Sequence, residues 1–451
     1  MEVTLMQMLT AREVRAERQR AMIKQFKRPV ISFSMNIPGP VKDSTLIRRG
    51  FLSGCEVLDG AFDSNVVLFR EIYPAVTGWE ALYVLDLEPR RVKEITASIE
   101  DSHGLGRLFD MDVIGPGGDK LDREMVGGGS RNCIVCGAPG RGCASRRVHS
   151  VEALQKAVER ILKNYFRRED IAAIGKLAVR CLIDEVNTTP KPGLVDLRNT
   201  GSHRDMDVQT FYRSAEALAG YFADCACIGL ETAAESPQET FRQLRLAGLQ
   251  AEKAMYAATL GVNTHKGAIF TLGILCGAAG RLWTGDAVWN PDAFFPLVSA
   301  MTREAMEADW AKGGNTVGYR LYADHGIRGI RGQAADGLPA VAEIGLPVFR
   351  KCLEAGMDRN EAGVRTLLHL IARVEDTNMI ARGGIAGARE AAARTRDLLK
   401  KNFTLSHVEE LDEWFISANL SPGGCADLLA AVYFLDSLIL TPNKTLSSSP
   451  V

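Results

Sequence analysis

The chain has 451 residues, of which 46% are hydrophobic and 24% charged, and its formal net charge is -1. This length predicts at least two domains, and the composition is typical of a soluble globular enzyme rather than a disordered or fibrous protein. Because acidic and basic residues balance, no chain-wide attraction for nucleic acid is expected, whereas local arginine clusters suit a nucleotide-sized ligand.

The N-terminal sequence and the cysteines indicate the cellular compartment. Met1–Met8 is followed by the charged run Ala11–Arg20, a pattern that matches neither a signal peptide nor a membrane span. Several of the ten cysteines stand beside apolar residues, as reduced core thiols do. We therefore expect a cytoplasmic protein whose partners include no membrane and no nucleic acid.

The first third of the chain mixes helical and extended patterns, which predicts an α+β domain over residues 1–166. The segment from Gly115 to Gly142 is rich in glycine, proline and arginine, so it is expected to be a loop or a small clamped insert. The expected helices are 2–27, 45–58 and 89–100, and the expected strands are 29–33, 66–69, 82–85 and 107–114.

From residue 151 onward nearly every segment repeats its apolar residues with a helical period, and alanine and leucine are prominent. This pattern predicts an all-α domain over residues 167–451, with the boundary near Phe166 to Asp170. The clearest expected helices are 153–166, 171–186, 207–223, 237–249, 362–372 and 427–440.

Two aspartates in the expected strand 107–114 are the first candidate catalytic groups. Asp110 and Asp112 stand two residues apart, so their side chains leave a strand on the same face and suit a Mg²⁺ that assists nucleotidyl transfer. A solvated strand edge is the alternative interpretation. Arginines close by in the sequence are suitable for binding a triphosphate, and the alternative is that they belong to a solvent-exposed loop. These arginines are Arg107, Arg123, Arg131, Arg141, Arg146 and Arg147.

A cluster of zinc-type ligands lies in the same glycine-rich region. Cys133 and Cys136 form a C-x-x-C pair, and Cys143 and His149 follow. Thiolates at this spacing are the usual ligands of structural Zn²⁺ in reduced compartments. A metal-free cysteine-lined turn and a redox pair are the alternatives.

Residues 7–150 resemble the citrate lyase holo-acyl-carrier-protein synthases, also called apo-citrate lyase phosphoribosyl-dephospho-CoA transferases. The resemblance implies that a serine of the carrier protein attacks the phosphate next to the ribose of a triphosphoribosyl group, and that pyrophosphate leaves. It also implies that Asp110 and Asp112 hold the metal, while Lys42 and the arginines neutralise phosphate charge. The blocks that carry the resemblance are 12–19, 36–42, 106–113 and 133–150.

In the second part, Pro190 and Pro192 end a helical pattern and predict a shaped loop that contains Lys191 and Asp196. A short segment dense in titratable groups follows, and it could be a binding site or only a polar segment that caps the next helix. Its side chains are Asn199, His203, Asp205 and Asp207, of which Asp207 stands in a capping position.

A second polar block precedes the apolar run 268–279. Asn263, His265 and Lys266 stand at an expected helix start, where backbone N–H groups and an adjacent lysine can bind phosphate. A plain helix cap is the alternative, and it explains Asn263 but not the His265–Lys266 pair. Small residues beside polar ones recur at 326–332, 376–384 and at Ser421-Pro422-Gly423-Gly424, and none of these is a P-loop or a dinucleotide fingerprint.

Residues 170–440 resemble the triphosphoribosyl-dephospho-CoA synthase family, in blocks at 190–196, 203–207, 263–267 and 421–427. The resemblance implies that the 2′-hydroxyl of 3′-dephospho-CoA displaces adenine from the ribose of ATP while the triphosphate stays attached. Such a reaction needs a base, a proton donor for adenine, and Mg²⁺ on the triphosphate. We assign metal or base roles to Asp205 and Asp207, and acid–base or orienting roles to His203 and His265. The expected substrate ligands are Lys191, Asp196, Asn263, Lys266, Gly423 and Gly424.

The two resemblances support each other because the product of the second reaction is the substrate of the first. The sequence therefore predicts a bifunctional transferase whose partners are ATP, 3′-dephospho-CoA and the apo acyl-carrier subunit of citrate lyase. Two alternatives stay open. Asp376-Thr377-Asn378 before a Gly/Ala helix prompts an N-ribosyl hydrolase related to ADP-ribosyl hydrolases, and the Cys/His cluster prompts a zinc-clamped binding module without turnover.

Overall fold

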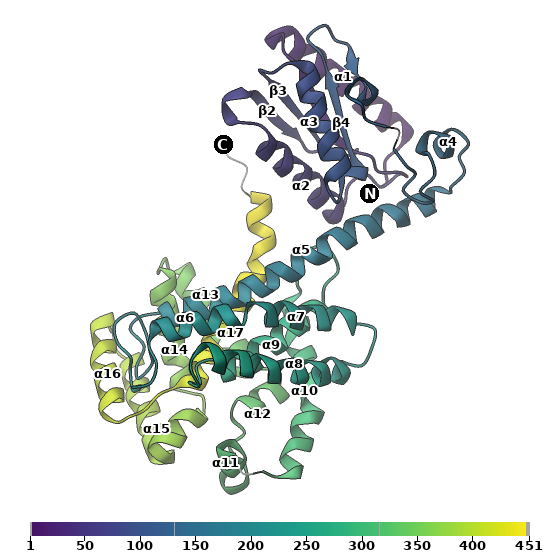
Figure 1. Ribbon diagram of the computed structural model, residues 1–451. Coiled ribbons are helices and arrows are strands. Elements are labelled where there is room, and N and C mark those ends of the chain that lie inside the picture. Colours follow the sequence, from purple (N-terminus) through teal and green to yellow (C-terminus); the bar gives the residue numbers. More distant parts are fainter. Residues whose placement is uncertain (1, 130, 315, 448–451) are drawn as a thin grey trace. The chain divides into compact units, whose positions relative to one another are not determined.

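The computed structural model describes residues 2–129, 131–314 and 316–447, without the side chains of residues 141, 144 and 440–447. The chain divides into two compact units, Met1–Glu169 and Asp170–Val451. Each unit has the composition of elements expected from its sequence: a small antiparallel sheet with helices in the first, and helices alone among the described residues of the second (Figure 1). No described helix is long and apolar enough to cross a membrane.

The first unit is built on a five-stranded sheet with the order β2-β3-β1-β4-β5. All neighbouring strands are antiparallel, and β1 at the centre pairs with both β3 and β4. The strands are β1 (Val30–Met35), β2 (Val67–Tyr73), β3 (Glu80–Leu85), β4 (Phe109–Ile114) and β5 (Lys120–Leu121). The helices are α1 (Leu5–Phe26), α2 (Thr45–Ala61), α3 (Pro89–Ser102) and the short α4 (Gly140–Ser145), with 3-10 turns at 64–66, 106–108 and 123–126.

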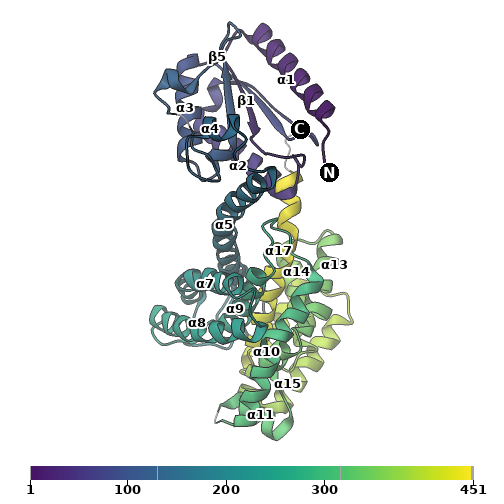
Figure 2. The same cartoon turned by 90° about the vertical axis from the view of Figure 1, so that its right-hand side faces the viewer.

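Helices cover both faces of this sheet, as the turned view shows (Figure 2). On one face, Met22, Ile23 and Phe26 of α1 pack on Val30, Leu82 and Val84. On the other face, Phe51 of α2 stacks on Phe33 of β1, with ring centroids 4.9 Å apart. Because side chains alternate along a strand, the α1 face also receives Asp110 and Asp112, which pair in register with Ser34 and Ser32.

The expected elements of the first unit are present, with two differences. The segment 107–114 begins as a 3-10 turn and becomes β4 only at Phe109. The segment 115–142, expected to be a loop or insert, contains the short strand β5 and the beginning of α4. The sequence also specifies where α2 begins, since the Ser44 side chain caps it by accepting a hydrogen bond from the backbone N–H of Ile47.

The second unit is an assembly of helices around one hydrophobic core. The first group is the part of α5 (Val151–Asn187) from Asp170 onward, α6 (Val208–Ala217), α7 (Ala219–Glu231), α8 (Pro237–Ala258), α9 (Lys266–Arg281) and α10 (Pro291–Lys312). The second group is α11 (Val317–His325), α12 (Gly329–Ala335), a π-helical turn (Ala340–Gly345), α13 (Leu346–Glu354), α14 (Arg359–Ile371), α15 (Thr377–Leu399), α16 (Leu405–Ser417) and α17 (Gly423–Ser447).

Helix α9 lies in the middle of this core, and nearly all of its residues from Ala268 to Gly280 are buried. It crosses α7 at backbone distance, because a Cβ on Gly229 would stand 1.9 Å from the carbonyl oxygen of Gly277, and one on Gly280 1.9 Å from that of Ala226. Only glycine permits such a crossing. The close packing fixes the N-terminus of α9, which carries the His265–Lys266 block.

Two expected helix boundaries were wrong. The helices expected at 153–166 and 171–186 are one continuous helix, α5, so the expected domain boundary at 166/167 lies inside a helix. The helix expected at 207–223 is two helices, α6 and α7, which meet at Leu218. The sequence 167–170 is polar and interrupts the apolar spacing, but arginine and glutamate are good helix formers, so the backbone continues.

Candidate active sites

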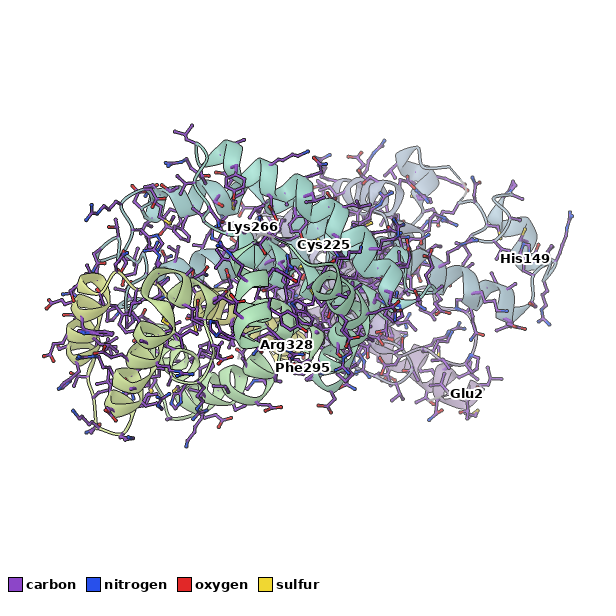
Figure 3. All side chains as sticks on the ribbon, turned by 90° about the horizontal axis from the view of Figure 1, so that it is seen from below. Glu2, His149, Cys225, Lys266, Phe295 and Arg328 are labelled. Atoms are coloured by element: carbon purple, nitrogen blue, oxygen red, sulfur yellow. The ribbon has the colours of Figure 1, made fainter. Side chains whose placement is uncertain are left out.

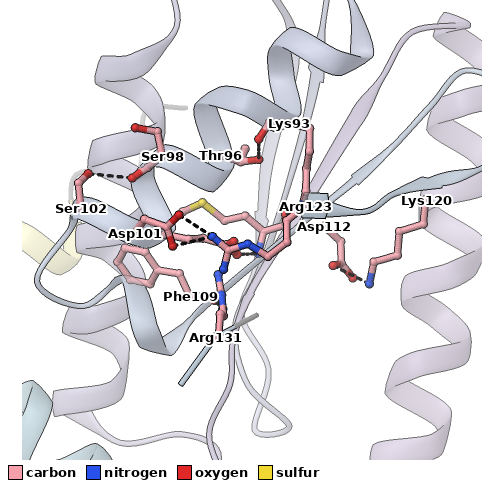
Figure 4. Close-up of polar contacts among 12 residues, drawn as sticks. Lys93, Thr96, Ser98, Asp101, Ser102, Phe109, Asp112, Lys120, Arg123 and Arg131 are labelled. Atoms are coloured by element: carbon pink, nitrogen blue, oxygen red, sulfur yellow. Dashed lines mark hydrogen bonds and ion pairs between the residues drawn. The ribbon is translucent and has the colours of Figure 1, made fainter. Parts of the chain in front are cut away.

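Asp110 and Asp112 project from the same face of β4, as their spacing predicted. The Asp112 carboxylate forms an ion pair with Lys120 at 2.6 Å (Figure 4). Asp110 is half-buried, and among the described residues no hydrogen bond reaches its carboxylate. Burial and the adjacent Asp112 raise the pKa of Asp110 above its usual value. A half-buried carboxylate without a bonding partner beside a second carboxylate is a plausible cation ligand set.

Asp110 opens onto a cavity of about 150 Å³ that α1 and the loop after β1 line with basic side chains. Lys42 donates a hydrogen bond to the carbonyl oxygen of Ile37, and burial and Arg12 lower its pKa. The basic residues of this cavity are Arg12, Arg15, Lys42 and Arg48. Arg15 and Arg48 are held in place by Glu80 and Asp43, at 2.5 Å each. The cavity therefore combines one half-buried carboxylate with four basic side chains, two of which are already paired with acidic residues, and this set suits a polyphosphate.

The other predicted phosphate ligands of the first unit do not line this cavity. Arg131 pairs with Glu100 and donates to the carbonyl oxygen of Phe109 at 2.8 Å (Figure 4). Arg107 donates to the carbonyl oxygen of Asn132. Arg146 and Arg147 are exposed just after α4, and the side chain of Arg141 lies outside the described residues. In this arrangement Arg107 and Arg131 connect the segment after β5 to the start of β4.

The second unit contains a larger cavity of about 480 Å³, which gathers most of the predicted residues of this unit. Those that line it are Lys191, His203, Asp205, Asn263, His265, Lys266, Gly423 and Gly424. Sequence reasoning singled out the segments 376–384 and 421–427 without assigning site roles to Asp376, Arg382, Ser421 or Asp427, and it missed Glu185 altogether; all five line the cavity. The blocks at 188–207, 261–267 and 421–427 therefore meet at one place, although they are far apart in the chain.

Two predicted residues have structural positions instead. Asp207 caps α6, accepting hydrogen bonds from the backbone N–H of Thr210 at 2.8 Å and from its hydroxyl at 2.7 Å. Asp196 is buried and accepts from the backbone N–H groups of Lys191, Arg198 and Asn199. Neither lines the cavity. These two carboxylates shape the loop that holds the cavity residues.

The loop is also fixed by the helix α16. The Asp412 carboxylate accepts from the backbone N–H of Gly193 and from the side-chain amide of Asn199, both at 2.8 Å. Gly193 has φ 71°, and a Cβ there would stand 2.1 Å from the carbonyl oxygen of Leu420. The site therefore requires glycine at this position for conformation and for space.

His203 is oriented from both ring nitrogens. The Arg382 guanidinium donates to Nδ1 at 3.1 Å, so Nε2 carries the proton and donates to the Ser421 hydroxyl at 2.9 Å. Burial, and then Arg382, lower the pKa of His203 to about 4. The imidazole is therefore neutral near pH 7, and it links the loop 190–207 to the starts of α15 and α17.

His265 is buried at the N-cap of α9, where its Nδ1 bonds with the Ser214 hydroxyl at 2.7 Å. Its Nε2 has no hydrogen-bond partner among the described residues. Burial, and then Lys191, lower the pKa of His265 to about 3. The neutral imidazole lines the cavity, and its buried Nε2 is a polar atom whose hydrogen-bonding capacity the described residues do not use.

Two carboxylates carried by helices also line the cavity. Glu185 of α5 forms an ion pair with the buried Lys191 at 2.5 Å, so the ammonium group of Lys191 is already neutralised by protein. Asp427 of α17 contacts the start of α9, and a Cβ on Gly267 would stand 1.8 Å from its Oδ2. Burial, and then Glu185 and Asp376, raise the pKa of Asp427 well above its usual value.

Helix N-termini converge on the same cavity. The starts of α9, α15 and α17 all contribute lining residues, and each end of this kind presents backbone N–H groups and a partial positive charge. Asp376 joins two of them, because it accepts from Asn378 and Met379 of α15 and from Cys425 of α17. Lys266, labelled in Figure 3, adds a half-exposed ammonium group that pairs with Glu252 at 2.8 Å.

In comparisons with known proteins, the two parts of the chain match two different families. The family model described as CitX: Apo-citrate lyase phosphoribosyl-dephospho-CoA transferase matches residues 3–165. The model described as CitG: ATP:dephospho-CoA triphosphoribosyl transferase matches residues 171–445.

Similar proteins include both fused and single-part chains. The Protein CitXG of Haemophilus influenzae is 33% identical over 96% of both chains. The Protein CitXG of Leuconostoc mesenteroides subsp. cremoris is 33% identical over 97% of both chains. The 2-(5''-triphosphoribosyl)-3'-dephosphocoenzyme-A synthase of Pectobacterium atrosepticum is 39% identical over 62% of this chain and 95% of its own.

Proposed function

This chain belongs to the family of fused CitX–CitG transferases, which serve the biosynthesis of the citrate lyase prosthetic group, and we propose that its two units catalyse consecutive steps. The second unit joins ATP and 3′-dephospho-CoA into 2′-(5″-triphosphoribosyl)-3′-dephospho-CoA and releases adenine. The first unit transfers phosphoribosyl-dephospho-CoA from this product to a serine of the apo acyl-carrier subunit and releases pyrophosphate.

The observation that carries the proposal is the convergence of three helix N-termini, the carboxylates of Glu185 and Asp427, and two neutral histidines in one cavity of about 480 Å³. The triphosphate of ATP would lie against the starts of α9, α15 and α17, with Arg382 supplying positive charge. Lys266 would add a second charge by exchanging its half-exposed ion pair with Glu252 for phosphate. Lys191 was expected to bind phosphate, but its ion pair with Glu185 commits its charge to the protein.

Displacement of adenine needs a proton donor for the leaving base and an acceptor for the proton of the attacking 2′-hydroxyl. Asp427 is our candidate donor, because burial and the neighbouring Glu185 and Asp376 raise its pKa and so favour its protonated form. Asp205 is our candidate acceptor, since it lines the cavity while 64% of its side chain stays exposed. His203 and His265 orient Ser421 and the ligand as neutral rings.

In the first unit, the cavity beside Asp110 would receive the triphosphate of the intermediate. Arg12, Arg15, Lys42 and Arg48 would neutralise charge on the phosphate next to the ribose and on the departing pyrophosphate. The serine oxygen of the carrier forms the new bond to phosphorus as the bond to the pyrophosphate oxygen breaks. The serine proton leaves to solvent or to a nearby carboxylate.

The residues of β4 fit a magnesium ion. Asp110 is half-buried beside Asp112, and Asp112 pairs with Lys120, whose side chain is 57% exposed and so exchanges at little cost. Asp110 and Asp112 would hold the ion together with phosphate oxygens of the substrate. When bound there, Mg²⁺ supplies positive charge to the transferred phosphate.

Mass spectrometry of the intact protein's reactions tests the proposal. ATP and 3′-dephospho-CoA should give free adenine and the triphosphoribosyl product, and added apo carrier should gain the mass of phosphoribosyl-dephospho-CoA. Adenine released from ATP without dephospho-CoA would support the N-ribosyl hydrolase alternative instead. That alternative is weakened by Asp376, which prompted it, because three backbone N–H groups occupy its carboxylate.

A further inference from the structure

The segment between β5 and α5 contains a compact group of four metal-type ligands. Ligand atoms of Cys133, Cys136, Cys143 and His149 all lie within 4.8 Å of one another. The sulfur atoms of Cys136 and Cys143 are 3.5 Å apart, and Nε2 of His149 is 3.3 Å from the sulfur of Cys136. His149 is labelled in Figure 3.

These distances match a tetrahedral zinc centre. Bonds of about 2.3 Å to sulfur and about 2.0 Å to nitrogen place two thiolates about 3.8 Å apart, and a thiolate and an imidazole nitrogen about 3.6 Å apart. A disulfide would require a sulfur separation of about 2.05 Å. The cluster therefore has the spacing of ligands around one ion, and no pair of its cysteines is bonded.

The backbone around Cys133 has the form of a metal-binding turn. The chain reverses between Asn132 and Pro139, which form an isolated β-bridge, and Cys133 donates its backbone N–H to the carbonyl oxygen of Ala138 at 2.7 Å. The backbone N–H of Val135 points at the sulfur of Cys133, at 3.5 Å. Such N–H contacts favour the thiolate form and hold it in position for a cation.

This segment lacks a hydrophobic core of its own. None of the described side chains between Asp122 and Lys156 is buried, and the segment holds the glycine run 127–129. Small modules that cannot bury apolar surface are commonly held together by a metal or by disulfides. Since the cysteines are not paired, a metal is the remaining stabiliser of that kind.

We propose that Cys133, Cys136, Cys143 and His149 bind one structural Zn²⁺ ion. All four positions are filled by protein, so the ion has no open position for catalysis. The ion closes the turn 133–136 onto α4 and the residues after it. Arg131 lies two residues before Cys133 and bonds to the carbonyl oxygen of Phe109, so the clamp positions the start of β4, next to Asp110.

Metal analysis of the intact chain, purified without chelator and without a metal-binding tag, is the first test. We expect about one zinc per chain in the native protein. Cys143→Ser should lower the zinc content at least tenfold, whereas Cys227→Ser, which changes a cysteine of α7 outside the cluster, should keep it. His149→Cys should also keep one zinc, because a four-cysteine set is equally suitable, whereas His149→Ala should lose it.

A second measurement covers the case in which the cysteine variants fold poorly. Zinc should be removed from the native protein with a chelator and replaced by Co²⁺, which should give the intense visible absorption of a tetrahedral cobalt thiolate site. Removal should speed proteolysis within 122–156 and slow carrier labelling, while adenine release by the second unit stays unchanged.

Three outcomes would overturn the proposal. Native protein with far less than one zinc per chain that takes up none when zinc is added would leave the cluster as a metal-free turn. A loss of two hydrogen masses assigned to a Cys136–Cys143 bond would make it a redox pair. A different metal at one atom per chain would refute the assignment to zinc.

Discussion

Asp427 has surroundings that are unfavourable for a negative charge, because it lies among protein groups with Glu185 and Asp376 close by. We predict that Asp427→Asn, which keeps the shape and removes the transferable proton, lowers adenine release by about two to four orders of magnitude. The measurement is chromatography of adenine formed from ATP and dephospho-CoA. Asp397→Asn on the exposed part of α15 serves as the matched control and should keep the normal rate. An Asp427→Asn rate within threefold of normal would exclude the proton-donor role.

His265 gives a prediction for stability against pH. Its pKa falls from 6.5 to about 3 on folding, so above pH 6.5 both states are neutral at this residue and it adds no pH dependence. Below pH 6.5 the imidazole of His265 is protonated in the unfolded chain but stays neutral in the folded chain. The free energy of unfolding therefore decreases as pH falls toward 3. We expect His265→Gln to flatten this decline in urea titrations followed by tryptophan fluorescence, whereas His325→Gln at an exposed position of α11 should not. Equal slopes in both variants would contradict the burial of an uncharged His265.

Helix α9 depends on glycine at its second residue. A Cβ on Gly267 would stand 1.8 Å from Oδ2 of Asp427, so Gly267→Ala must separate the helix start from that carboxylate. We predict a loss of about 1–3 kcal/mol in the free energy of unfolding and at least a tenfold loss of adenine release. Gly220→Ala is the matched control, since Gly220 is also the second residue of its helix, α7, and has nothing within 4 Å of the added Cβ. There alanine should leave activity unchanged and raise stability by up to about 1 kcal/mol. Equal effects of Gly267→Ala and Gly220→Ala would contradict the importance of close packing at Gly267.

Local patterns predicted the elements better than the residues of the sites. Helical and extended spacing located most helices and strands of both units, because periodicity reports which face of an element is buried. It missed the continuity of α5, because residues 167–170 are polar and interrupt the apolar pattern. Several of them are nevertheless good helix formers, so the helix continues through them.

The cavity blocks at His203, His265 and Gly423 were found because they interrupt helical patterns with polar residues. Glu185 and Asp427 were missed because each occupies an ordinary helical position, and only the tertiary fold shows that it faces a cavity. Their one visible signal is a charged residue within an apolar stretch, such as Asp427 between Ala426 and Leu428. Asp207 was overinterpreted, since its capping position alone explains it.

For the whole molecule, the two compact units predict separable activities. Asp110→Asn should release adenine at the normal rate and fail to label the carrier. Asp427→Asn should fail to release adenine, yet label the carrier normally when premade triphosphoribosyl-dephospho-CoA is supplied. Both rates are followed by mass spectrometry in the same samples, and a mixture of the two variants should restore the complete sequence from ATP. If either substitution abolished both reactions in protein with unchanged circular dichroism, the two sites would not be independent.

The cavity of the second unit joins residues from distant parts of the chain, from Glu185 in α5 to Asp427 in α17. This has a consequence for the order in which the protein forms on the ribosome. At about 5–20 residues per second, the roughly 240 residues between these two carboxylates take roughly 10 to 50 s to translate. The sheet of the first unit has all its strands before residue 122, so it can fold during this interval. The nascent chain thus carries a completed transfer site for some time before the site that makes its substrate exists, and the face of α9 that packs on α17 stays uncovered until α17 is made.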